Sequence, residues 1–392
     1  MSEYVKWGVA LGSLIIATAQ YPAALAQTDP VPQATADEQA IVVTARRREE
    51  SLSTVPVSIV ALQGARLAES NVQVLSDVTN LAPGIRFTSE GDPGNTNITL
   101  RGLGNLPLGT GVPAVVNYFS EVPLPAVGVD LPILDLQSVQ VLKGPQGTLF
   151  GRNTIGGAIL LTPTKPTYEF EGYVQGTLGN YDYRALEGAI NIPIVQDRVA
   201  LRVAAQIRRR DGLTENLNGP RDFDNIHQEM IRGTLLLQPT ERLTNTTTVN
   251  YFKANENSGG SVLTAYIPAS LGPLEPIFGS QLAGYLAAQQ QVGIHKVFSA
   301  TPFSHSNRRT LIFVNRTSLD LSDDVTVNNI FGYVKTRYDI AGNNDGLGPL
   351  VGPFPFTVFR PTLVSDRKYI TEELQLQGSS LGSVAKIGGS QR

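Results

Sequence analysis

The strongest constraint on the fold is a regular alternation of apolar and polar residues that begins near Glu169. In one segment, the residues Leu201, Val203, Ala205 and Ile207 alternate with Arg202, Ala204, Gln206 and Arg208. A period of two predicts β-strands with one apolar face. We expect about eight such strands of roughly ten residues each, the last of them ending near Gln377.

The connections between these strands alternate in length. Short turns, such as 239–242 and 322–324, alternate with long segments, such as 254–308 and 339–368. This pattern is typical of a bacterial outer-membrane β-barrel. A soluble β-sandwich is the alternative, but loops of roughly thirty to fifty residues are unusual in compact domains. We therefore favour a mainly β fold with an antiparallel transmembrane barrel.

The N-terminus indicates export. Lys6 precedes an apolar run from Val9 to Ala19, and Ala24-Leu25-Ala26 supplies small residues at both positions of a cleavage site. This pattern predicts a signal peptide at residues 1–26. A transmembrane anchor is disfavoured, because the run is shorter than the ~20 residues that a membrane span needs.

The number of strands raises a physical problem. A barrel of about eight strands is filled by its own side chains and has no room for another domain. An open sheet edge in lipid is excluded as well, because unpaired backbone groups there cost several kcal/mol each. We therefore expect the chain to be a truncated or frameshifted product of a longer gene, with an incomplete barrel at 167–392.

A small α+β domain is predicted at 51–166. It contains a stretch from Ser138 to Pro163, in which two apolar runs, 139–142 and 158–161, flank a glycine-rich segment. Because glycine adopts the backbone conformations of tight turns, this stretch predicts a compact strand–turn–strand unit. A phosphate-binding loop is the alternative, but no Gly-Lys-Ser or Gly-Lys-Thr follows.

Residues 27–50 are predicted to form a flexible arm. Residues 27–39 have almost nothing to bury. The run Ile41, Val42, Val43, Thr44, Ala45 follows, and such a β-branched run is suited to pairing with the sheet edge of a partner protein. It is equally suited to be the first strand of the next domain, and the residues alone leave both possibilities open.

Composition and motifs exclude several functions. The net charge of −3 provides no basic surface for nucleic acid, and the chain has no cysteine for a disulfide or a thiol site. His227, His295 and His305 lack the spacing of metal ligands, and no catalytic motif stands out. We therefore predict no enzymatic activity, no cofactor and no metal site.

Taken together, these segments resemble the TonB-dependent outer-membrane receptors. Ile41–Ala45 resembles the TonB box, Asn97–Gly104 resembles a plug strand, and Val139–Thr162 is similar to the plug signature of the family. The resemblance implies a plug domain followed by the first part of a barrel that has about 22 strands in the family.

The resemblance also implies energised uptake across the bacterial outer membrane, with TonB as the partner that pairs with the TonB box. In the family, plug arginines lie against glutamates of the barrel. This implies a latch between Arg101 and Arg152 of the plug and Glu372 and Glu373 of the wall. Separate solvation of these groups in a wet lumen is the alternative.

The ligand is the least constrained property. Residues 105–112 and 255–308 are the candidate ligand-contacting segments, and both carry few charges. The resemblance favours a ferric siderophore or similar iron complex, while haem, cobalamin and oligosaccharides stay open. A passive porin-like channel and a non-functional truncated receptor are the alternatives, although a porin needs neither a plug nor a pairing arm.

Overall fold

The computed structural model describes residues 42–43, 50–51, 57–89, 94, 96–104, 113–126, 130–151, 153–219, 221–299, 304–342, 346–347, 350, 362–378 and 385–387. The predicted signal peptide, the predicted linker and most of the arm lie outside these residues. So do Ile41, Thr44, Ala45, Arg152 and the candidate segment 105–112.

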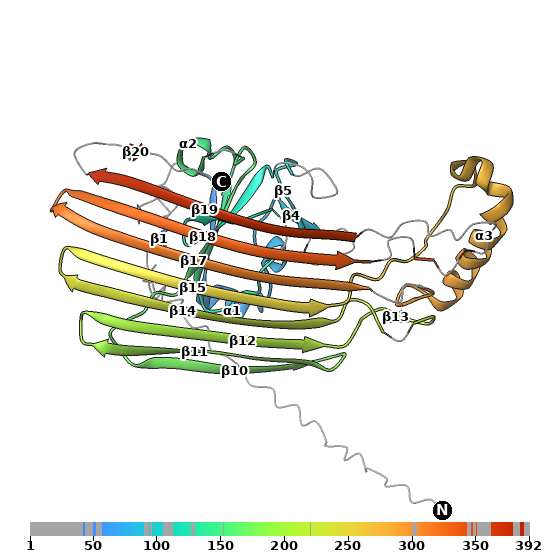
Figure 1. Cartoon of the computed structure of the whole chain (residues 1–392), viewed down its shortest axis with the longest axis horizontal. Helices are drawn as coiled ribbons and strands as arrows, with labels where there is room; N and C mark the ends of the chain where they lie inside the picture. The colour runs from blue at the N-terminus through green and yellow to red at the C-terminus, as the bar shows by residue number, and fades with distance from the viewer. Residues whose placement is uncertain are drawn as a thin grey trace, which may run out of the picture. The chain divides into compact units, whose positions relative to one another are not determined.

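The larger part of the described chain is one antiparallel sheet of nine strands, each paired with the next in chain order. Figure 1 shows the long strands side by side. They are β10 (Glu171–Gly179), β11 (Tyr183–Val195), β12 (Val199–Arg210), β14 (Ile226–Thr240), β15 (Leu243–Glu256), β17 (His305–Ser322), β18 (Val325–Ala341), β19 (Thr362–Gly378) and β20 (Ala385–Ile387). Within the described residues the sheet does not close into a ring. The predicted fold class is confirmed, and only the short β20 was not predicted.

The two faces of this long sheet are inverted relative to a water-soluble protein. On β12, Arg202, Gln206 and Arg208 are buried, whereas Ile207 is 47% exposed. On β10, Val174 and Leu178 are 81% and 83% exposed. A sheet with polar side chains inside and apolar side chains outside is the arrangement of a membrane barrel, so a soluble sandwich is ruled out.

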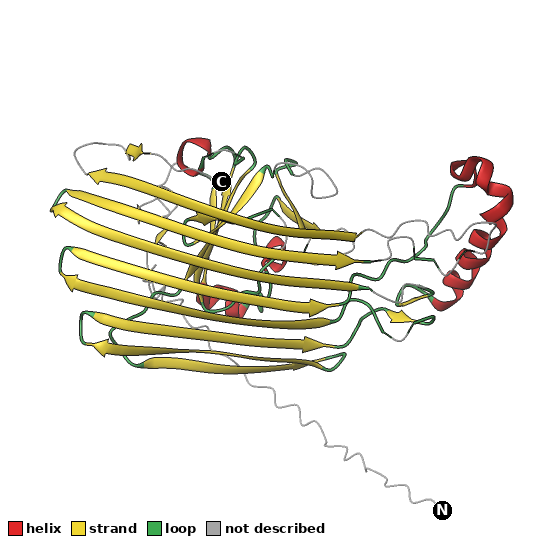
Figure 2. Ribbon diagram, in the orientation of Figure 1, coloured by secondary structure: helices red, strands yellow, loops and turns green. Residues whose placement is uncertain are grey.

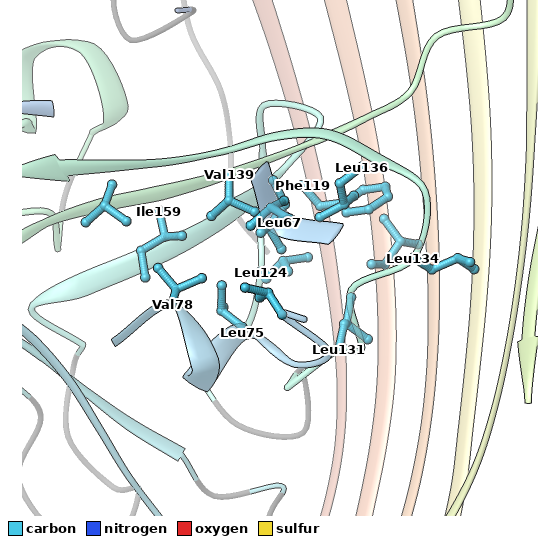
Figure 3. Packing of buried hydrophobic residues seen from close by; sticks show 14 of the residues in the cluster. Leu67, Leu75, Val78, Phe119, Leu124, Leu131, Leu134, Leu136, Val139 and Ile159 are labelled. Atoms are coloured by element: carbon cyan, nitrogen blue, oxygen red, sulfur yellow. The ribbon is translucent and has the colours of Figure 1, made fainter. Parts of the chain in front are cut away.

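The N-terminal domain is built on a five-stranded mixed sheet. Its order is β3 (Ile59–Gln63), β8 (Leu136–Lys143), β9 (Gly157–Pro163), β6 (Val115–Phe119) and β7 (Val122–Pro123). The helices α1 (Gly64–Glu69) and η2 (Leu75–Asn80) follow β3, and the hairpin β4 (Ile85–Ser89) and β5 (Thr96–Leu100) follows them. Figure 3 shows buried side chains of these elements in one cluster, among them Leu67, Val78, Phe119 and Val139.

The glycine-rich stretch forms the predicted strand–turn–strand unit. Its strands β8 and β9 pair antiparallel, and the short helix α2 (Gly147–Phe150), which was not predicted, lies between them. Gly157 has a φ of +147°, and a Cβ there would lie 2.2 Å from the carbonyl oxygen of Leu142. The close approach of β9 to β8 therefore requires glycine at this position.

The largest departure from the prediction lies in the segment 254–308. It contains η3 (Pro268–Leu274) and α3 (Glu275–Val292), shown in Figure 2 as the long helix beyond the sheet. Phe278 and Leu282 of α3 are buried with Leu347 and Leu350 of the next connection. In addition, β13 (Glu215–Asn216) pairs in parallel with β16 (Lys296–Val297). No helix in the described part of the chain is long and apolar enough to cross a membrane.

Candidate functional site between the N-terminal domain and the long sheet

Five arginines project from one face of the long sheet toward polar partners. They are Arg202 and Arg208 on β12, Arg232 on β14, and Arg308 and Arg316 on β17. All have even numbers, as do the buried neighbours Ala204, Thr234 and Ile312, so strand alternation places them on the same face. A buried guanidinium is tolerated only where acceptors surround it. Here, the N-terminal domain supplies many of the acceptors.

The best-defined contact joins Arg202 to Asp135. Nε and Nη2 of Arg202 donate to the two carboxylate oxygens of Asp135 at 2.8 and 2.7 Å. The two side chains are only 8% and 5% exposed. Nη1 of Arg202 also lies 3.2 Å from Oε1 of Glu171 on β10. This paired geometry is the strong form of an arginine–carboxylate contact.

Asp135 ends a segment, Asp130–Asp135, that we call the strap. The strap leads into β8 without being part of a strand, so its carbonyl oxygens need donors from elsewhere. Nη1 of Arg232 donates to the carbonyls of Leu134 and Asp135, at 2.9 and 3.1 Å. Nε2 of Gln206 donates to the carbonyl of Ile133 at 3.3 Å. Side chains of the long sheet thus satisfy the strap's backbone.

Arg232 and Arg308 make further contacts at the same interface. The Arg232 guanidinium lies 5.2 Å from the centre of the Phe119 ring. Arg308 donates to the carboxylate of Glu256, and both side chains are 1% exposed. Nη1 of Arg308 lies 3.5 Å from the carbonyl oxygen of Asp130.

Asp130 has an unusual protonation equilibrium. Burial raises the pKa of its carboxyl group to about 6, although Arg308 and a hydrogen bond from the Thr96 hydroxyl act in the opposite direction. The Thr96 hydroxyl lies 3.5 Å from the carboxyl group. The first residue of the strap therefore changes charge near neutral pH.

Two other parts of the N-terminal domain reach the long sheet. Glu121, next to β7, lies 3.0 Å from Arg316. Val122 lies so close to β18 that a Cβ on Gly332 would be 2.6 Å from its methyl groups. Gln73, just before η2, accepts hydrogen bonds at its side-chain oxygen from Tyr183 at 2.6 Å and from Arg208 at 3.2 Å.

Three of the four predicted latch residues are described, and they lie elsewhere. Nη2 of Arg101 donates to the hydroxyl of Ser58, within the N-terminal domain, at 3.1 Å. On β19, Glu373 is the register partner of the buried Ile330, and Glu372 is the partner of Phe331 on the opposite face. Since Arg152 is outside the described residues, the latch stays a prediction.

The arginine contacts were not predicted from the sequence. In Arg202–Asp135 and Arg316–Glu121, the acid belongs to the N-terminal domain and the arginine to the sheet. This is the reverse of the charge arrangement that the family resemblance implied. A usable signal was present, because these arginines occupy the polar positions of alternating strands.

The predicted TonB box is partly described. Val42 and Val43 form β1 (Val42–Val43), which pairs antiparallel with β2 (Glu50–Ser51). The Val43 side chain is fully buried in a cluster with Val116, Tyr118, Leu142 and Phe150. The two described residues of the run therefore form a first strand, with Val43 packed on the N-terminal domain, which is one of the two arrangements that the sequence allowed.

The histidines have separate partners. Nε2 of His305 lies 3.0 Å from Asp339, and Nε2 of His227 lies 3.7 Å from Glu229. The carbonyl oxygen of His295 accepts a hydrogen bond from the backbone of Glu215. Within the described ranges, no group of three or more histidine or acidic side chains is arranged to hold a metal ion.

Comparisons with known proteins agree with this architecture. The model of the TonB-dependent receptor plug domain matches residues 51–158. The pesticin receptor of Yersinia pestis is 31% identical over 170 residues, which are 42% of this chain and 25% of that receptor. The iron-regulated outer membrane virulence protein of Vibrio cholerae is 28% identical over 189 residues, 45% of this chain and 29% of that protein. These alignments span less than a third of either relative.

Solved structures share the fold over most of the chain. The ferric yersiniabactin uptake receptor FyuA from Yersinia pestis matches with a TM-score of 0.66 at 19% identity, covering 85% of this chain and 46% of that one. The siderophore receptor PiuA from Acinetobacter baumannii matches with a TM-score of 0.62 at 15% identity, covering 86% and 44%. Residues 51–158 therefore match the plug domain of TonB-dependent receptors, and most of the chain shares the fold of these two solved receptors.

Proposed function

We propose that this chain serves TonB-energised uptake of a scarce nutrient, with a ferric siderophore or a similar iron complex as the ligand. From here on, the N-terminal domain is called the plug and the long sheet the wall. The observation that carries the proposal is that β1, which belongs to the predicted TonB box, packs on the plug through Val43, and that buried ion pairs such as Arg202–Asp135 bind the plug to the wall. The outer membrane has neither ATP nor an ion gradient, so work has to reach the plug through a mechanical link.

The first strand is suited to a change of partner. β1 has two residues and is paired with β2, which also has two. Such a small hairpin has little stability of its own, so its position depends on the burial of Val43. Once released, the run Ile41–Ala45 offers a backbone edge to TonB, in the mode in which an extended segment joins a partner's sheet.

Iron complexes are the favoured ligand class because two of the similar solved structures are named as siderophore receptors. FyuA is described as a ferric yersiniabactin uptake receptor and PiuA as a siderophore receptor. A vitamin B12 transporter of Vibrio vulnificus, 26% identical over 147 residues, represents the main competing class. The connection that contains α3 is the candidate ligand-contacting segment, and α3 itself has one charged residue, Glu275.

The proposal is tested by deleting Ile41–Ala45 and, as a matched control, five residues of the preceding linker, Pro30–Ala34. Radiolabelled ferric yersiniabactin is the probe, and radiolabelled cyanocobalamin is the contrast. We expect the first deletion to abolish energised uptake and to leave binding to cells intact, while the control deletion changes neither. Undiminished uptake after the first deletion would reject the TonB-box assignment, and uptake that survives an uncoupler would indicate a passive channel.

A further inference from the structure

A group of polar side chains interrupts the apolar outward face of the wall. Residues with odd numbers face outward on β15, β17 and β18, because even-numbered residues such as Phe252, Ile312 and Val334 are buried. On β19 the even-numbered residues face outward, because Gln375 is buried. We call the outward polar group the island, and it consists of Asn245 and Thr247 on β15, Asn315 and Thr317 on β17, Asn329 on β18, and Glu372 on β19.

The island lies in the middle of the apolar band. On β17, the outward residues between Arg309 and Asp323 are Leu311, Phe313, Asn315, Thr317, Leu319 and Leu321. On β18, the outward residues between Asp324 and Lys335 are Val325, Val327, Asn329, Phe331 and Tyr333. In both strands, two apolar side chains therefore separate the island from the charged residues on either side. Charged residues mark the limits of the band, because a charge on the lipid face is tolerated near the interfaces and costly between them.

The island occupies one sector of the wall and does not continue around it at the same depth. Thr247 is the register partner of Leu235 on β14, and Leu235 is the register partner of Leu201 on β12. Both leucines face outward, because the even-numbered Thr234 and Ala200 beside them are buried. The polar character is therefore a property of one side of the wall, which suits a neighbour that approaches from that side.

Four residues of the island satisfy one another across β15 and β17, which lie side by side in Figure 1. The amide nitrogens of Asn245 and Asn315 each donate to the side-chain oxygen of the other at 3.2 Å. They also donate to the hydroxyls of Thr317 and Thr247, at 2.7 and 2.8 Å. The two hydroxyls donate back to the amide oxygens at 3.3 and 3.1 Å. This closed ring lets four polar side chains lie between lipid tails.

Glu372 is not satisfied in this way. Nδ2 of Asn329 donates to Oε1 of Glu372 at 3.3 Å. Among the described residues, this is the contact that the Glu372 carboxylate makes. A carboxylate accepts hydrogen bonds at both oxygens, and an ionisable side chain at this depth needs a partner. Asn329 has a second amide hydrogen, which its bond to Glu372 leaves available.

We propose that the island is the contact surface between two copies of this chain, side by side in the membrane. All copies insert with the same direction and depth, so the islands of two copies meet at one height about a two-fold axis along the membrane normal. The contact is self-complementary, because the second amide hydrogen of Asn329 in each copy is a donor for Glu372 of the other. A foreign protein would need a matching donor at this depth, whereas a second copy carries it. This inference does not depend on the proposed uptake function.

Energy transfer between labelled copies of the full chain tests the proposal. Donor and acceptor fluorophores are attached to Gln290→Cys, at an exposed position of α3 in a chain that has no other cysteine. The copies are mixed in vesicles of phosphatidylethanolamine and phosphatidylglycerol and diluted with lipid. With the native island, transfer should stay above the level of random proximity. Asn329→Leu with Glu372→Leu should weaken the association about 30-fold, because two symmetry-related hydrogen bonds are lost.

Two further variants show whether the effect belongs to the island. Asn307→Leu changes an outward residue of β17 beyond Arg309, outside the apolar band, and should leave the association unchanged. Glu372→Gln should keep most of the association, because its carboxamide oxygen still accepts from Asn329. Transfer at the random level in the native chain would overturn the inference. So would a double leucine variant that associates as well as the native chain.

Cysteine cross-linking keeps the test valid if the double leucine variant does not fold. Thr317→Cys lies in the island, and Ile190→Cys lies on β11, at an outward position that is 40% exposed and four strands away from β17. In outer-membrane vesicles, a short thiol-reactive linker should join two copies through Thr317→Cys and not through Ile190→Cys. The inference fails if Thr317→Cys gives no dimer or is joined to a different protein. Neither TonB nor a ligand is present, so these results are distinct from those of the uptake assay.

Discussion

Replacing Arg202 by alanine should open the plug more than any exposed arginine substitution does. The change leaves the carboxylate of Asp135, 5% exposed, without its two strongest hydrogen bonds. Removing one partner of a buried ion pair costs about 3–5 kcal/mol. We take the lower end, about 3 kcal/mol, because water can reach part of the vacated volume.

The assay uses the absence of cysteine in the native chain. Ser138→Cys places a thiol on β8 at a position that is 4% exposed, so maleimide reacts with it only after the plug opens. At 1.4 kcal/mol per factor of ten, Arg202→Ala should accelerate this labelling about 100-fold. Arg184→Ala removes an exposed pair with Asp182 and should change the rate less than about fivefold.

A double variant distinguishes two possible causes of faster labelling, an unpaired buried charge and a general loss of packing. Arg202→Ala with Asp135→Ala leaves no buried carboxylate without a partner, since Glu171 is half exposed, so it should label more slowly than Arg202→Ala alone. If the double variant labels as fast as or faster than the single variant, or if Arg202→Ala behaves like Arg184→Ala, the account of the strap is wrong.

Three further predictions concern the plug and its first strand. The pKa of Asp130 is about 6 in the folded chain, above its ordinary value of 3.8, so its protonated form stabilises the fold. That contribution is full below about pH 4, is lost as pH rises through about 6, and amounts to at most about 3 kcal/mol. Urea titrations at pH 4.5 and pH 7 should show this loss in the native chain and not in Asp130→Asn. Gly157→Ala should destabilise the plug by about 2 kcal/mol or more, because the added Cβ would clash with the Leu142 carbonyl oxygen. Gly176→Ala is the control, because a Cβ at that position has no atom within 4 Å. The labelling rate of Ser138→Cys should rise in the first variant and not in the second. Val43→Asp places a charge in a fully buried site and should free β1, which faster protease cleavage of the arm would reveal; cleavage at the native rate would contradict the burial of this strand.

Much of the wall could be predicted because a period of two is a strong local signal. It located β12 and β17 and predicted one apolar face, and in the structure that face is the outer one. The helix α3 was missed although Phe278, Leu282 and Tyr285 have helical spacing, because the proline and glycine residues around it indicate a loop. Its stability also depends on Leu347 and Leu350, which are distant in the sequence.

The candidate site was harder to predict for a different reason. The sequence shows that Arg202 and Arg232 occupy polar positions, but not which plug atoms face them. Asp135 and the carbonyls of the strap come within reach only through long-range packing, about 70 to 100 residues away along the chain. The family resemblance implied a latch with the opposite charge arrangement, in which Arg101 of the plug and Glu373 of the wall take part instead of these residues.

The pairing of β13 with β16 has a consequence for the timing of motion in the two connections that contain them. Backbone hydrogen bonds from Glu215 to His295 and from Leu217 to Val297, with an ion pair between Glu215 and Lys296 at 2.8 Å, join two connections that lie about 80 residues apart. Aligning the two connections costs conformational entropy, and the chain loses this entropy once, during folding. It does not lose it again each time a ligand binds. The two connections should therefore move as a single slow body, on a microsecond or longer timescale, instead of as independent fast loops.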